Sequence, residues 1–181
     1  MIFCLSIIAY AQTPQDRATE LKKQAQSSLN QKDYIKARYL FKKAYEAFAS
    51  RENYPQAIEC GVQANALYVR ENFYKEGFEL CRDMEQLLWT GEQNKKKVFY
   101  DLRFLINKER LQMYTALKNP AQAKTQLDKL EEMANLAKND SLTEVLLYTK
   151  ANYYYTFNQS TQGDACFRKL INQYKLSLIH I

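Results

Sequence analysis

The sequence predicts an all-α protein built from repeated pairs of helices. Three observations lead to this prediction: the composition, a residue frame that recurs along the chain, and helix-capping signals. The 181 residues include only four glycines and three prolines. A β-sandwich, a β-barrel or a glycine-looped nucleotide-binding fold needs many more such residues for its turns. Hydrophobic residues make up 46% of the chain and charged residues 25%, proportions that suit one folded domain rather than a disordered chain.

The recurring frame places a small residue first, a larger apolar residue four positions later and a third residue three positions after that. Its clearest copy is Ala37, Phe41 and Ala44. Spacings of four and three put the three residues on one face of a helix. A small side chain at the first position allows two antiparallel helices to approach closely. The four small residues, which we call the anchors, lie 40, 46 and 40 residues apart at Ala37, Gly77, Ala123 and Gly163.

A second helix precedes each anchor. The positions nine and twelve residues before an anchor share one helical face, so each repeat unit is expected to be a helix, a turn and a helix. Nine residues before the anchors lie Ser28, Tyr68, Tyr114 and Tyr154, and twelve residues before them lie Ala25, Asn65, Leu111 and Ala151.

This pattern resembles the tetratricopeptide repeat, which has Tyr on its first helix and an Ala, Phe, Ala series on its second. The resemblance covers residues 14–174 and is clearest at Tyr34, Ala37, Phe41 and Ala44. It implies a right-handed superhelix, an α-solenoid, of four antiparallel helix pairs. The repeats are longer than the usual length of about 34 residues and resemble those of bacterial regulatory tetratricopeptide proteins.

Capping signals set the expected boundaries of the helices. Asn119-Pro120 and Thr13-Pro14 each place a capping residue before a proline in the first turn, and Pro55 also marks a helix start. The segment 141–144 reads as a capping box, and Gly91 as a C-terminal cap. The helices are therefore expected at 14–31, 34–50, 55–71, 74–90, 95–118, 120–138, 141–158 and 161–174.

The N-terminal residues 1–11 are expected to be a signal peptide, which is truncated if Met1 is an internal methionine. An apolar run from Ile2 to Ile8 precedes Ala9-Tyr10-Ala11, the small-x-small pattern that signal peptidase requires. The run is shorter than the roughly 20 residues of a membrane span. No basic residue precedes it, which leaves two alternatives: either Met1 is an internal methionine and the true start lies upstream, or the segment is a buried first helix.

The C-terminal residues 176–181 resemble one reading frame of a transposase adapter used in sequencing libraries. On that interpretation the tail is not native, and the natural sequence is interrupted near Lys175. The alternative is a short native apolar tail. The helical repeat domain is then expected to span residues 12–175.

Charge and cysteines exclude several kinds of site. The net charge of +6 is spread along the chain, and only Lys95, Lys96 and Lys97 form a run, whereas nucleic-acid binding favours a clustered basic stripe. Beyond the leader, three cysteines remain at Cys60, Cys81 and Cys166, without a C-x-x-C motif. Zinc binding and thioredoxin-like redox chemistry are therefore not expected. A disulfide between Cys60 and Cys81, which lie on paired helices, stays possible.

The expected binding surface is the groove lined by the first helix of each unit. No spacing brings two carboxylates to one cleft, and there is no nucleophile motif or phosphate loop, so no catalytic residue is expected. Amides, cations and tyrosines in the groove could hold an extended peptide. The alternative is an ordinary hydrated surface. The groove residues are Lys22, Gln26, Asn30, Glu59, Arg70, Lys108, Gln112, Tyr148, Asn152 and Tyr155.

The resemblance also bears on the ligand. A peptide-carboxylate clamp of the family needs Lys and Asn at set groove positions, and Lys22 matches the first of them. Gln26 stands in place of the Asn, and the next unit has Val62 and Ala66. These substitutions argue against a carboxylate clamp.

The expected function is non-catalytic binding of a protein or peptide in the periplasm, without a cofactor, a metal or nucleic acid. The layout is similar to the periplasmic sensor regions of membrane-bound histidine kinases and related regulators, so we expect part of a larger signal-transduction protein. In that case the membrane is reached only through a C-terminal segment missing from this sequence. The alternatives are a free-standing periplasmic scaffold and a cytoplasmic regulator with a structural first helix.

Overall fold

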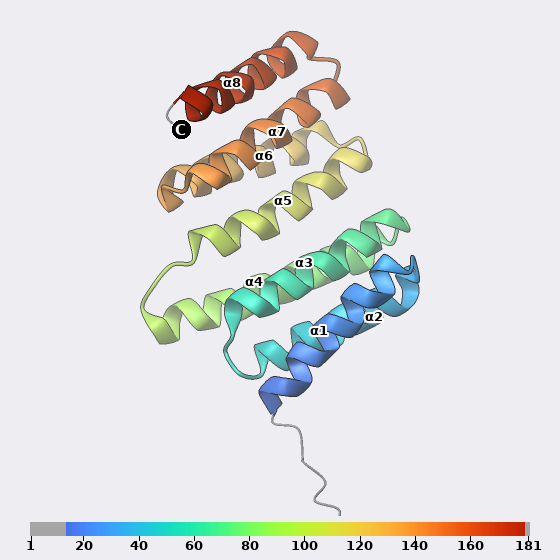
Figure 1. The fold of residues 1–181 in the computed structure, drawn as a ribbon. Helices are drawn as coiled ribbons and strands as arrows, with labels where there is room; N and C mark the ends of the chain where they lie inside the picture. The colour runs from blue at the N-terminus through green and yellow to red at the C-terminus, as the bar shows by residue number, and fades with distance from the viewer. Residues whose placement is uncertain (1–13, 180–181) are drawn as a thin grey trace, which may run out of the picture.

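The computed structural model describes residues 14–179, with their side chains described from residue 17 to 173, and this part of the chain is all-α (Figure 1). It forms eight helices, most of them 16 to 18 residues long. They are α1 (Pro14–Asn30), α2 (Tyr34–Ala49), α3 (Tyr54–Arg70), α4 (Tyr74–Lys95), α5 (Tyr100–Ala116), α6 (Pro120–Ala137), α7 (Asp140–Thr156) and α8 (Ser160–Ile179).

The helices pack mainly with their neighbours in the sequence. Each helix contacts the next one, and the stack runs from α1 at one end to α8 at the other (Figure 1). Further contacts join odd-numbered helices, among them α3 with α5 and α5 with α7. Both faces of α5 are therefore covered, and it contributes Ile106 and Met113 to one hydrophobic core and Phe104 and Leu111 to the next.

The four anchors are buried, as the repeat frame predicts. Ala37 and Ala123 have no exposed surface, and Gly77 and Gly163 are also buried. The residues twelve positions before the anchors are buried as well. The frame therefore identifies the residues at which the helices of each pair meet.

Each connection between consecutive helices contains one non-glycine residue with a positive φ angle. The left-handed backbone ends one helix and lets the chain reverse before the next. No glycine has a positive φ among the described residues. The left-handed residues are Lys32, Glu52, Asn72, Lys96, Lys118, Lys138 and Asn158.

Four helices begin at a polar residue whose side chain accepts a hydrogen bond from a backbone N–H of the first turn. These caps are Asp33, Asn53, Asn119 and Asn139. The bonds satisfy backbone donors that have no partner within the helix. The predicted start at Asn119-Pro120 is confirmed.

The predicted boundary between α4 and α5 is wrong. The helix α4 continues through Gly91 to Lys95, and Lys96 rather than Gly91 takes the left-handed conformation at its end. Gly91 lies against the side chain of Tyr54, where a Cβ atom would come within 2.5 Å of the ring. Its lack of a side chain is needed for helix packing, and the next helix begins only at Tyr100.

Smaller corrections apply at α7 and α8. Asn139 rather than Ser141 caps α7, so the capping box predicted at 141–144 is two residues late. The last helix extends beyond the predicted end at 174 to Ile179. The expected signal peptide at 1–11 and the cap at Thr13 lie outside the described residues, as do the last two residues of the expected tail.

The run Tyr153-Tyr154-Tyr155 shows how the helical turn distributes consecutive side chains. Tyr153 is buried, Tyr154 is partly buried and Tyr155 is exposed. The prediction that the three cannot all be buried is confirmed. Tyr153, rather than the frame residue Tyr154, is the most deeply buried of the three.

Candidate functional site

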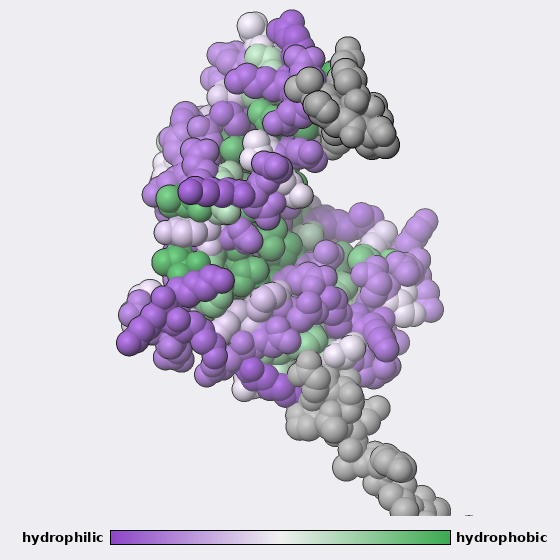
Figure 2. Space-filling view, turned by 60° about the vertical axis from the view of Figure 1, so that its left-hand side comes forward, coloured by the Kyte–Doolittle hydropathy of each residue, from purple (hydrophilic) through white to green (hydrophobic). Residues whose placement is uncertain are grey.

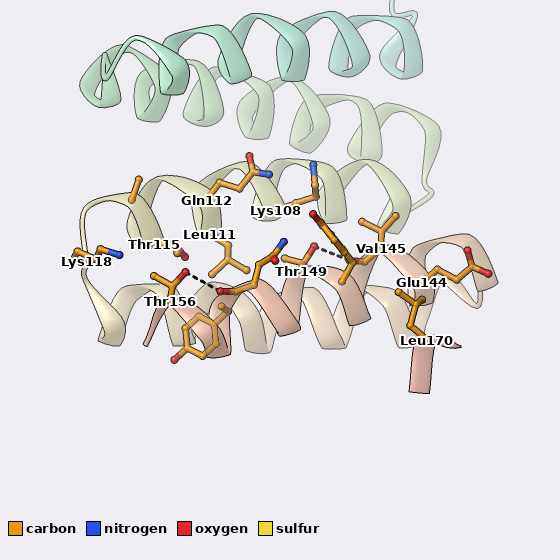
Figure 3. Close-up of a pocket in the computed structure, with 14 residues that line it drawn as sticks. Lys108, Leu111, Gln112, Thr115, Lys118, Glu144, Val145, Thr149, Thr156 and Leu170 are labelled. Atoms are coloured by element: carbon orange, nitrogen blue, oxygen red, sulfur yellow. Dashed lines mark hydrogen bonds between the residues drawn. The ribbon is translucent and has the colours of Figure 1, made fainter. Parts of the chain in front are cut away.

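A pocket of about 530 Å³ lies between α5 and α7. Figure 3 shows side chains from these two facing helices around it, with one residue from α8 at its edge. Its lining residues are Lys108, Leu111, Gln112, Thr115, Ala116, Lys118, Glu144, Val145, Tyr148, Thr149, Asn152, Tyr153, Thr156 and Leu170. The helix spacing explains the set, because residues three and four apart lie on one helix face.

The base of the pocket is apolar. Leu111 of α5 and Tyr153 of α7 are buried there, whereas Val145 and Tyr148 are 37% and 54% exposed. The ring of Tyr148 makes an edge contact with Phe167 of α8, with 6.2 Å between ring centroids. That contact holds an exposed aromatic side chain beside the opening.

Two threonines of the pocket use their hydroxyl groups within α7. Thr149 Oγ1 donates to the carbonyl of Val145 at 2.7 Å, and Thr156 Oγ1 donates to that of Asn152 at 2.8 Å (Figure 3). The exposed side-chain amides of the pocket are those of Gln112 on α5 and Asn152 on α7. Each amide can donate and accept hydrogen bonds.

A buried charged group lies behind the pocket. The side chain of Glu109 on α5 is buried, and its Oε1 lies 3.3 Å from Lys108 Nζ. Its other oxygen accepts a hydrogen bond of 3.0 Å from Asn65 Nδ2 on α3. The carboxylate therefore connects the pocket lysine to the contact between α3 and α5.

The structure brings four of the ten predicted groove residues together in this pocket. Lys108 and Gln112 come from α5, and Tyr148 and Asn152 come from α7. On each helix the two residues lie one helical turn apart, on the side that lines the pocket.

The other six predicted groove residues lie elsewhere. Lys22 of α1 pairs with Glu59 of α3, with 2.6 Å between Nζ and Oε2. Gln26 and Asn30 are hydrogen-bonded to each other along α1. They form a polar surface at the first two odd-numbered helices, separate from the pocket.

Arg70 and Tyr155 face neighbours within their own part of the stack. The guanidinium of Arg70 lies 3.9 Å from the ring centroid of Tyr34. Tyr155 packs against Phe167 and hydrogen-bonds Asp164 of α8. Neither residue lines the pocket.

Sequence reasoning missed Glu109 and Asn65. A glutamate beside a lysine on a helix reads as part of a solvated face. A signal was present for Asn65, because it occupies a frame position held by Ala25, Leu111 and Ala151 in the other units. A polar side chain at a core position needs a buried partner.

The three described cysteines are buried free thiols, and no disulfide joins Cys60 to Cys81. Burial raises the pKa of both Cys60 and Cys81 to about 12, so neither thiol ionises readily. Within residues 14–179, no cluster of three or more His, Cys, Asp or Glu side chains could hold a metal ion. In the same part of the chain, no helix combines the length and apolar character that a membrane span requires.

Comparison with known proteins gives no further assignment. No protein-family model, curated protein or solved structure matches this chain.

Proposed function

We propose that this chain is a non-catalytic module that binds a protein or peptide, built as a tetratricopeptide-like superhelix, with the pocket between α5 and α7 as its docking site. The observation that carries the proposal is the convergence of Lys108, Gln112, Tyr148 and Asn152 on one pocket. The repeat frame by itself predicts these four residues as groove positions of the third and fourth units.

The pocket is suited to part of an extended peptide. Its volume of about 530 Å³ is within the usual range of about 300–1,000 Å³ for ligand sites. Leu111, Val145 and Tyr148 offer apolar and aromatic surface for a side chain. Gln112 and Asn152, on opposite sides, can pair with the backbone N–H and C=O groups of a bound chain.

The packing of the helices supports the repeat architecture. In a stack of helix pairs, the first helices of successive units lie side by side and line one surface. The contacts of α3 with α5 and of α5 with α7 follow that arrangement. The space-filling view also shows the molecule hollowed on one side between its two ends (Figure 2).

We further propose that the protein is exported and has a sensory role. The Ala9-Tyr10-Ala11 pattern favours the periplasm. The similarity of the repeat layout to periplasmic sensor regions favours membership of a larger signal-transduction protein, with a free-standing periplasmic scaffold as the alternative. Cell fractionation of the native protein separates these possibilities from a cytoplasmic regulator. An unprocessed chain in the cytoplasm would refute export.

The binding proposal can be tested with a phage-displayed library of random peptides selected on the purified protein. We expect selected peptides to bind with micromolar dissociation constants and to lose at least about tenfold in affinity on Val145→Trp, which fills the pocket from an exposed position. The matched control is Val98→Trp, because Val98 is 42% exposed and lies outside the pocket.

Two results would contradict the proposal. One is the absence of any enriched peptide. The other is a set of selected peptides that bind Val145→Trp as tightly as they bind the Val98→Trp control.

A further inference from the structure

We infer that the pocket between α5 and α7 takes an uncharged, apolar group and discriminates against a carboxylate, because the buried Glu109 already neutralises its lysine. The chemistry of the natural partner, inferred in this way, rests on the proposed function. The preference of the pocket for an uncharged group follows from the arrangement of Lys108, Glu109 and Asn65 alone.

Glu109 holds the ammonium group of Lys108 in an ion pair. The glutamate is only 1% exposed, and its Oε1 lies 3.3 Å from Lys108 Nζ. A buried carboxylate that loses its cation is strongly destabilising. A ligand carboxylate that drew Lys108 away would leave Glu109 in that state, so the competition favours the existing pair.

Among the described side chains, Lys108 is the cation that forms an ion pair with this carboxylate. The adjacent Arg110 pairs with Glu85, with 2.6 Å between Nη1 and Oε1. Asn65 donates a hydrogen bond to Glu109 Oε2, and an amide supplies no net charge. Lys108 is therefore the cation on which the buried charge depends.

Asn65 is held in a fixed orientation. It has no exposed surface, and within the described part of the chain its Oδ1 has no hydrogen-bond partner. A Cβ atom added at Gly77 would lie only 3.0 Å from that oxygen, so the amide packs closely against α4. Since only its NH₂ group can donate to Glu109, the carboxylate determines which way the amide points.

The charges around the pocket are balanced. Lys108 and Lys118 line it together with Glu144, and Glu109 behind Lys108 supplies the second negative charge. Because the ammonium group of Lys108 is already paired with Glu109, this lysine offers a bound anion little attraction. Its remaining surface is the apolar base and the neutral amides of Gln112 and Asn152.

The test compares two fluorescent probes that share one ring system. N-phenyl-naphthylamine is uncharged, whereas anilinonaphthalene sulfonate is an anion. We expect the wild-type protein to bind the neutral probe about tenfold more tightly than the anion at the pocket. Fluorescence that is lost in Val145→Trp but kept in Val98→Trp is assigned to probe bound at the pocket.

The variant Glu109→Gln keeps an acceptor for Asn65 and releases Lys108. We expect it to raise the affinity of the anionic probe about tenfold and to leave that of the neutral probe unchanged. Glu131→Gln is the matched control, because it breaks a lysine pair, Lys150–Glu131 at 2.5 Å, that lies outside the pocket. We expect no change in the ratio of the two affinities for that control.

The inference is overturned if wild-type protein binds the anionic probe as tightly as the neutral one, a result that needs no variant. It is also overturned if Val145→Trp leaves the neutral probe bound, or if Glu109→Gln, shown to be folded by circular dichroism, does not shift the ratio. Failure of the peptide selection with the neutral probe still bound in the pocket would refute the proposed function and leave this inference intact.

Discussion

The substitution Gly91→Ala tests the packing of α3 against α4. A Cβ atom at this position would lie 2.5 to 2.9 Å from three atoms of the Tyr54 ring, closer than carbon atoms can pack. The ring is buried and also packs against Phe99, with 5.6 Å between ring centroids, so moving it away from an added methyl group would disturb a second contact.

Two opposing contributions set the magnitude. Replacing a glycine by alanine inside a helix stabilises it by about 1 kcal/mol. Overpacking a core contact costs about 1–3 kcal/mol. Gly91→Ala is therefore expected to lower the free energy of unfolding by up to about 2 kcal/mol, although alanine is the better helix former.

Urea unfolding followed by circular dichroism measures this effect, and a double-mutant cycle identifies its cause. In a Tyr54→Leu background the ring is absent, so Gly91→Ala is expected to stabilise by about 1 kcal/mol. Gly61→Ala is the control, because its nearest neighbour is the flexible thioether of Met84, and we expect a smaller loss. A gain in stability from Gly91→Ala in the wild-type background would refute the reasoning.

Three further predictions concern the core, the ion pair and the thiols. Ala37 has no exposed surface, so Ala37→Leu should destabilise by about 1–3 kcal/mol in urea unfolding, and an unchanged midpoint would refute the helix contact there. A hydrogen bond from Arg103 holds the pKa of Glu92 below its ordinary value, so the stabilisation is present above the unfolded-state pKa and is lost as pH falls through the folded one. Glu92→Gln should therefore lower stability at neutral pH and weaken its dependence on acid, and equal acid sensitivity of both proteins would contradict this. Burial raises the pKa of Cys60 and Cys81 to about 12, so both thiols should react slowly with Ellman's reagent until urea unfolds the protein, and rapid labelling of native protein would show that they are accessible.

Much of the fold could be predicted from the sequence because its signals are local. The small anchors, such as Ala37 and Gly77, lie at helical spacing from their apolar partners, and Asn119 directly precedes a proline. The end of α4 could not be predicted in this way. Gly91 resembles a helix cap in sequence, but the reason for a glycine there is the ring of Tyr54 on another helix.

The site was predicted only in part for a related reason. Helical periodicity selects Lys108, Gln112, Tyr148 and Asn152 as facing residues, and the pocket contains them. Periodicity does not show whether a surface position opens into a pocket or is covered by a neighbour. Periodicity assigns groove residues to each odd-numbered helix in the same way. In the structure, however, Lys22 of α1 forms an ion pair with Glu59 of α3.

The ion pair between Lys108 and Glu109 is a second feature that the sequence alone does not predict. On one helix, Lys108 and Glu109 are adjacent and point in different directions, so their spacing does not predict a pair. The pair forms because the contact of α3 with α5 buries Glu109 and supplies Asn65 as its second partner. That information exists only after the helices have packed.

The limited contact between α6 and α7 has a mechanical consequence for the stack. These two helices contact each other less than any other consecutive pair, and the contact of α5 with α7 across the same boundary is also small. The boundary is therefore the most compliant place in the stack, and it is the one that the pocket spans. A ligand held by both α5 and α7 would add contacts at this boundary, so we expect binding to reduce the relative motion of the helices on either side of it.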